Sequence, residues 1–162
     1  MTFTRFTILS LIIMFISPSA GAVNLTGTWA GKFTCTGFDG EKFTFVQNNQ
    51  SLKISQTNGN KVFVQWFDQG VLASNFSGFV TNRISRPDTK GHAAIADCVT
   101  KSDITTGFSE IADLNVSTIP SKGKGSLTGA SIYTDKGVEV TQCKWTFKLV
   151  DTATPAIPAG CP

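Results

Sequence analysis

The sequence feature that most constrains the fold is a strict alternation near the start of the chain. In residues 25–35 (LTGTWAGKFTC) the odd positions hold Leu25, Trp29, Phe33 and Cys35, with glycines between them. The even positions hold threonine, alanine and lysine. Successive side chains of a β-strand point to opposite faces, so a period of two predicts a strand with one face on a core.

The same pattern returns near the end of the chain, in residues 142–149 (QCKWTFKL). Between the two, Asp-Gly at positions 39–40 and Asn-Gly at positions 58–59 are typical of hairpin turns. Further strand-like segments follow at short intervals: 43–46, 52–55, 61–67, 71–84, 93–99, 108–116, 125–134 and 138–150. Segment 108–116 also fits a helical spacing, but its surroundings favour a strand. We expect one all-β domain of about eight strands over residues 23–150.

Residues 1–22 have the pattern of a cleaved signal peptide. Arg5 provides a positive start, residues 8–16 (ILSLIIMFI) are apolar, and Ala20-Gly21-Ala22 is a small-residue cleavage site. The apolar run is much shorter than the roughly 20 residues of a membrane-spanning helix. The pattern predicts cleavage before Val23 and a secreted or periplasmic protein without a membrane span.

Charge and motifs exclude several functions. The whole chain has a net charge of +3 and residues 1–22 contain only Arg5, which leaves +2 and scattered lysines, a poor basis for binding nucleic acid. Motifs of hydrolases, metalloproteases and nucleotide-binding enzymes are absent. His92 is the only histidine, and no CxxC pair occurs. Asp97 and Glu110, with Asp113, are compatible with an acid–base cluster or with outward-facing strand residues. We predict no catalysis, no cofactor and no metal site.

Three β architectures compete for this pattern. An immunoglobulin-like sandwich needs a tyrosine two residues before its second cysteine, where this chain has Ala96. An outer-membrane barrel needs an apolar outer face, but Lys32, Lys144 and Lys148 lie opposite the tryptophans. A single antiparallel up-and-down barrel remains, which closes by pairing its first strand with its last.

Closure of that barrel suggests how the cysteines pair. If Trp29 lies opposite Leu149 in an antiparallel ladder, Cys35 lies opposite Cys143 on the same inward face, as a cross-strand disulfide requires. Four cysteines allow three connectivities, and this one leaves a second disulfide, Cys98–Cys161.

The C-terminal segment differs in composition from the strands. Residues 151–162 contain three of the six prolines and end in Cys161-Pro162. Proline cannot donate a ladder hydrogen bond, so we expect a tail on the surface that is pinned by Cys161.

Gly27-Thr28-Trp29 at the opening of a short exported barrel resembles the G-x-W signature of the calycin group, which includes lipocalins, avidins and lipocalin-like bacterial protease inhibitors. A tail cysteine bridged to a strand is also similar to the lipocalin arrangement. The resemblance implies a lipocalin-like barrel. The late arginine that covers the tryptophan in the family is absent, so Lys144 or Lys148 would have to take its place.

Two functions fit these observations. The first is the binding of a small apolar ligand inside the barrel. It requires that the aromatic rings line an open interior, whereas the same rings could instead fill the barrel as an ordinary core. The residues concerned are Trp29, Phe33, Phe45, Trp66, Phe76, Trp145 and Phe147. The alternative is a protein-binding module, such as a secreted protease inhibitor, that acts through loops at residues 85–91 and 120–125.

Overall fold

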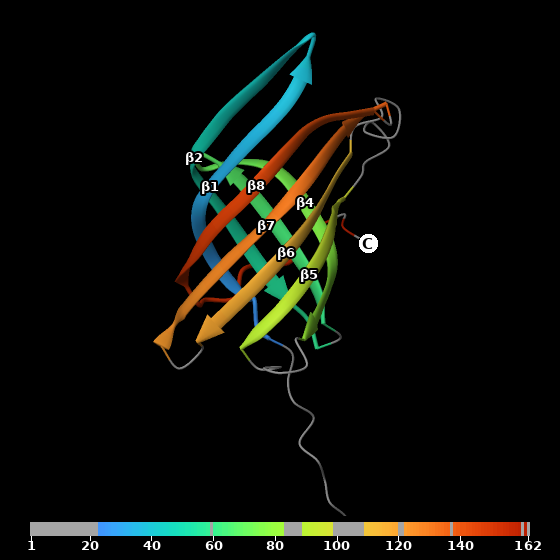
Figure 1. Cartoon of the computed structure of the whole chain (residues 1–162). Helices are drawn as coiled ribbons and strands as arrows, with labels where there is room; N and C mark the ends of the chain where they lie inside the picture. Colours follow the sequence, from blue (N-terminus) through green and yellow to red (C-terminus); the bar gives the residue numbers. More distant parts are fainter. Residues whose placement is uncertain are drawn as a thin grey trace, which may run out of the picture.

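The computed structural model is a closed antiparallel barrel of eight strands (Figure 1). It describes residues 23–58, 60–82, 89–98, 109–119, 122–136, 138–159 and 161. The strands are β1 (Gly27–Asp39), β2 (Glu41–Gln56), β3 (Lys61–Asp68), β4 (Val71–Asn82), β5 (Lys90–Asp97), β6 (Ser109–Ile119), β7 (Lys124–Asp135) and β8 (Val138–Asp151). The described residues contain no α-helix, so the prediction of a single all-β up-and-down barrel is confirmed.

The barrel closes between its first and last strands. Each strand pairs with the next along the chain, and β1 also pairs with β8. Trp29 lies opposite Leu149 and Cys35 opposite Cys143, as the alternation predicted. Closure leaves no strand at an open edge, where unpaired backbone groups would invite association with other chains.

Both predicted disulfides are present. Cys35–Cys143 joins the first and last strands across the closing ladder, with 4.0 Å between the two Cα atoms. Cys98–Cys161 attaches the tail to the end of β5, with a Cα–Cα distance of 5.2 Å. No described cysteine is free. The first disulfide therefore reinforces the barrel seam, and the second holds the tail.

The tail crosses the outer wall of the barrel. Ser55 on β2 donates a 2.6 Å hydrogen bond from its hydroxyl to the Pro155 carbonyl. Phe63, which pairs with Ser55 across β2 and β3, points outward and yet is only 7% exposed. The tail therefore lies on the outer face of β2 next to Phe63, which is shielded from water although it points outward.

One end of the barrel, the base, is plugged by the residues before β1. Val23 and Leu25 are buried there, and the Trp29 indole donates a 2.9 Å hydrogen bond to the Leu25 carbonyl. Gly27 has φ of +142°, a backbone conformation that favours glycine, where the chain turns from the plug into β1. The expected role for Lys144 or Lys148 over Trp29 is wrong: both are exposed on the outer face.

A bulge in β2 changes which residues point into the barrel. Gly31 pairs with Gln50, but Phe33 pairs with Gln47, so β2 carries one extra residue at this point. Asn49 lies within this bulge and has a positive φ of +58°. Segments 43–46 and 52–55 belong to one long strand that contains this bulge. On the hairpin side of the bulge the odd-numbered residues of β2 face inward, whereas on the other side the even-numbered residues do.

Several predictions fall outside the described residues. These are the signal peptide at residues 1–22, most of the loop at 85–91, and positions 120 and 121 of the second loop. Segment 108–116, which also fits a helix, is a strand from residue 109 onward.

Candidate functional site

The barrel interior is filled from the base to its middle. Trp29, Phe76 and Trp145 are fully buried, and Phe147 is 1% exposed. Their rings pack together with the aliphatic side chains of the other strands in one core. Four of the seven predicted ligand-binding residues are therefore placed in the packed core rather than beside an open space.

The other end of the barrel is open and contains a cavity of about 240 Å³, which we call the mouth cavity. It brings together the other three predicted residues, Phe33, Phe45 and Trp66. Its complete lining is Phe33, Cys35, Phe45, Gln47, Trp66, Glu110, Tyr133, Thr141 and Cys143. Cavities for drug-sized ligands are usually about 300–1,000 Å³, so this cavity suits a smaller molecule.

Aromatic rings form the floor and one wall of the mouth cavity. Phe33 meets Trp66 edge to face, with ring centroids 5.1 Å apart, and meets Trp145 beneath it at 4.7 Å. Phe45 stacks on Phe43 at 5.9 Å and is 40% exposed at the rim. Edge-to-face contacts hold rings in fixed orientations, so the floor is rigid.

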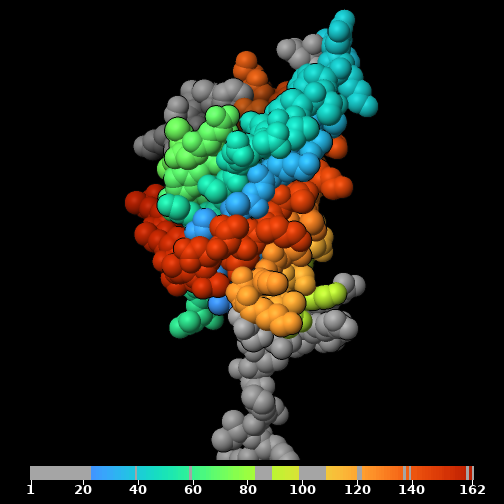
Figure 2. Space-filling view, turned by 90° about the vertical axis from the view of Figure 1, so that its left-hand side faces the viewer, coloured from blue at the N-terminus to red at the C-terminus, as the bar shows by residue number. Residues whose placement is uncertain are grey.

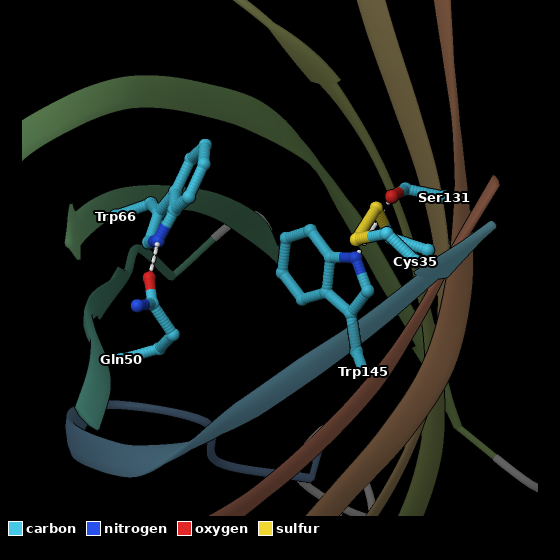
Figure 3. Close-up of a disulfide and its surroundings, with 6 residues drawn as sticks. Cys35, Gln50, Trp66, Ser131 and Trp145 are labelled. Carbon is cyan, nitrogen blue, oxygen red and sulfur yellow. Dashed lines mark hydrogen bonds between the residues drawn. A yellow bond between two sulfur atoms is a disulfide. The ribbon is translucent and has the colours of Figure 1, made fainter. Parts of the chain in front are cut away.

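Two tryptophans are oriented by buried polar side chains (Figure 3). The Trp66 indole donates a 2.6 Å hydrogen bond to the Gln50 side-chain oxygen, and the Gln50 amide donates to Asp68 at 2.6 Å. On the opposite wall the Trp145 indole donates to the Ser131 hydroxyl at 2.9 Å. These bonds fix the face that Trp66 presents to the cavity.

A carboxylate lies among these rings. Glu110 is at the start of β6 and lines the mouth cavity. Burial raises the pKa of Glu110 above its ordinary value, a hydrogen bond from Ser131 acts in the opposite direction, and the nearby Asp97 raises it further. Asp97 in turn accepts a 2.6 Å hydrogen bond from the Ser74 hydroxyl.

The three acidic residues considered together in the sequence are separated by the barrel wall. Asp97 and Glu110 interact on the inside. Asp113 points outward and forms an ion pair with the His92 imidazole. The arrangement is thus a pair of inward carboxylates and one outward ion pair, not a cluster of three.

Gln47, Glu110, Tyr133 and Thr141 line the cavity but were not predicted to do so. For Glu110 and Tyr133 the alternation of the sequence contained the signal. Glu110 lies two residues before the buried Ala112, and Tyr133 lies two residues after the buried Ser131, so each shares the inward face of its strand. Gln47 faces inward only because of the β2 bulge, which the alternation does not reveal.

A larger depression of about 580 Å³ lies on the outer wall, over β4 to β7. Alanines 94, 96 and 130 form its floor between the larger Ile111 and Ile132 side chains. It is a shallow area where small outward residues meet large ones on the same sheet, and it has no buried polar group in its lining.

The β1–β2 hairpin projects beyond the rest of the barrel (Figures 1 and 2). Phe38 near its tip is 67% exposed and Val46 is 49% exposed. This hairpin is the most prominent extension of the described chain (Figure 1). Phe45 on its β2 arm lines the mouth cavity.

The described residues offer no group of three His, Cys, Asp or Glu side chains that could hold a metal ion. Within the same part of the chain, no helix is long and apolar enough to cross a membrane.

Together, these features define the class of protein: a disulfide-bonded, closed eight-stranded barrel with a plugged base and an open, aromatic-lined mouth. Comparisons with protein-family models and with curated proteins found no match to this chain.

Proposed function

We propose that this chain is an exported small-molecule-binding barrel, which holds a small aromatic or apolar ligand in the mouth cavity. The observation that carries the proposal is a cavity of about 240 Å³ whose floor and wall are the rings of Phe33, Phe45 and Trp66. Apolar concave sites with a few fixed polar groups are typical of small-molecule binding. The barrel supplies a rigid frame, and its filled base confines the ligand to the mouth.

Export is supported by two independent features. Residues 1–22 have the composition of a signal peptide. The chain also forms two disulfides, which persist in oxidising compartments such as the periplasm or the extracellular space.

Titration with benzyl alcohol, a small neutral aromatic molecule, tests ligand binding. The three tryptophan indole N–H groups give separate cross-peaks in a ¹H–¹⁵N NMR spectrum. We expect a saturable shift of the Trp66 cross-peak, while the Trp29 cross-peak at the plugged base stays in place, because its indole bonds to the Leu25 carbonyl far from the mouth.

A pair of variants locates the site. Trp66→Leu removes a ring of the cavity wall and is expected to weaken benzyl alcohol binding about tenfold. Phe79→Leu changes a ring that is 60% exposed on the outer wall and is expected to leave binding unchanged. The proposal is wrong if neither benzyl alcohol nor its charged analogue benzylamine shifts the Trp66 resonance, or if both variants bind benzyl alcohol as the wild type does.

The projecting β1–β2 hairpin supports a second candidate, a protein-binding module such as a protease inhibitor. Exposed apolar side chains on a projecting hairpin, here Phe38 and Val46, are common at protein interfaces. Inhibition of a secreted serine protease that is lost in Phe38→Ser, together with no response to benzyl alcohol, would favour this function instead.

A further inference from the structure

The most unusual group in the barrel interior is the carboxyl of Glu110. The inward residues that follow it on β6 are Ala112, Leu114 and Val116, all buried. Placing a carboxylate among apolar side chains is unfavourable unless a partner stabilises its charge. A mouth cavity built only for a neutral apolar ligand would not require it.

The barrel holds Glu110 in a defined position. The Trp145 indole donates to the Ser131 oxygen, so the Ser131 proton is directed to another acceptor, and Ser131 bonds to Glu110. An ionised carboxylate has about four acceptor sites, and this bond uses one of them. Glu110 therefore keeps acceptor capacity on the side that lines the cavity.

The charged groups that act on this region from the two adjacent strands, Asp97 on β5 and Asp135 on β7, are both acidic. Asp97 on β5 acts on Glu110, and the pKa of Tyr133 on β7 is raised by burial and by Asp135, Glu110 and Asp97. A cation that entered the mouth would be attracted by this field, whereas an anion would be repelled.

The aromatic wall faces the same space. The rings of Phe33, Phe45 and Trp66 line the cavity that Glu110 lines. The faces of aromatic rings attract cations, with tryptophan the strongest, and the attraction increases when the cation is removed from water. A carboxylate and aromatic rings that line one cavity are a combination that recognises a positively charged organic group.

We propose that the mouth cavity selects small organic ammonium ions, whose apolar body packs on Phe33, Phe45 and Trp66 while the ammonium group pairs with Glu110. This inference rests on the proposed small-molecule function and adds the chemical class of the ligand. Glu110 is the residue that determines specificity, and the aromatic rings supply most of the contact surface.

Two probes of the same shape separate the inference from the proposed function. Benzylamine carries an ammonium group where benzyl alcohol carries a neutral hydroxyl. By calorimetry at neutral pH we expect the wild type to bind benzylamine at least tenfold more tightly than benzyl alcohol. Equal affinity for the two probes overturns the charge inference and leaves the proposed function standing. If neither probe binds, both fail.

Variants identify the carboxylate responsible. Glu110→Gln has nearly the same shape and is expected to bind both probes equally, with its benzyl alcohol affinity retained. Asp113→Asn is the matched control. Asp113 lies on the same strand as Glu110, but its carboxylate faces outward. A tenfold preference for benzylamine that persists in Glu110→Gln contradicts the inference.

A measurement on the wild type alone gives the same test without a variant. Because protons compete for Glu110, benzylamine affinity is expected to fall as pH is lowered from neutral toward 4.5, the ordinary pKa of a glutamate. The amine keeps its charge over this range because its pKa lies far above neutrality, as for lysine. Benzyl alcohol affinity should stay constant, and a parallel loss for both probes would contradict the role of Glu110.

Discussion

At the scale of single residues, polar groups in the barrel fall into two kinds. Gln50 and Ser131 each receive an indole N–H and hold a tryptophan in place. Glu110 and Asp97 carry charge into the same region, with no tryptophan to orient. The first kind satisfies the hydrogen-bonding needs of buried rings, and the second gives the mouth its electrostatic character.

The raised pKa of Glu110 makes a prediction about stability. A raised pKa in the folded state means that the folded protein holds this proton more tightly than the unfolded chain. The corresponding stabilisation is fully present below about pH 4.5, the unfolded value, and is lost as pH rises through the higher folded-state pKa. We therefore expect Glu110→Gln to be more stable than the wild type above neutral pH.

Urea unfolding of both proteins as a function of pH measures this difference. The gap in unfolding midpoint between the two proteins should close as pH falls below 4.5, the unfolded-state pKa, because the wild-type carboxyl then becomes protonated in both states. The other carboxyls are shared by both proteins, so their titration cancels except at Asp97, which interacts with Glu110. A gap that does not change with pH would contradict the assignment.

At the scale of elements, irregularities decide what the regular strands present. The bulge at Asn49 turns Phe45 and Gln47 to the inside of β2, where they complete the mouth cavity. The tail performs a different task on the outside, where it lies next to Phe63. Neither the bulge nor the tail follows the strand alternation of the residues around it.

Removal of the tail disulfide tests the second of these elements. The Cys98→Ala/Cys161→Ala double variant frees the tail end, whose bridge spans a sequence separation of 63. Loop-closure entropy predicts a loss of about 4 kcal/mol in unfolding free energy, with an additional loss if Phe63 becomes exposed. Chemical denaturation measures the loss, and faster proteolysis within residues 152–161 should accompany it.

A narrower substitution provides the control for that experiment. Ser55→Ala removes only the bond to the Pro155 carbonyl and leaves the disulfide in place. We expect it to lower the unfolding free energy by about 1 kcal/mol. If the disulfide variant were no less stable than Ser55→Ala, the tail would not be held by Cys161 as described.

At the scale of the whole molecule, the barrel depends on the seam between β1 and β8. That ladder extends from Thr28, opposite Asp151, to Gly37, opposite Thr141, and Cys35–Cys143 lies within it. Every strand has two neighbours, so no strand is able to separate without breaking two ladders. Unfolding should therefore be cooperative.

The seam disulfide allows this to be measured. In Cys35→Ala/Cys143→Ala the backbone ladder remains, so we expect the barrel to stay closed and to lose about 4–5 kcal/mol, given a sequence separation of 108. Unfolding curves from tryptophan fluorescence and far-ultraviolet circular dichroism should still coincide. Separate transitions for the two signals would indicate that the seam opens before the rest of the barrel.

Much of this architecture followed from the sequence. Alternation at both ends of the chain fixed the inward faces of β1 and β8, and closure then predicted the register that places Cys35 opposite Cys143. Which face of a strand points inward depends on neighbouring residues of that strand, and the alternation of polar and apolar side chains indicates it directly. For that reason the fold, the disulfides and the surface tail were all predictable.

The mouth cavity was predictable only in part. Sequence reasoning selected the interior rings, but Trp29, Phe76, Trp145 and Phe147 fill the core while Phe33, Phe45 and Trp66 border a space.

What the sequence by itself determined was therefore which side chains face inward, because that depends on neighbours along one strand. Where the interior is full and where it is hollow was decided only by the tertiary structure. Volume inside a barrel is a sum over eight strands, their bulges and the plug at the base, and no single strand records it.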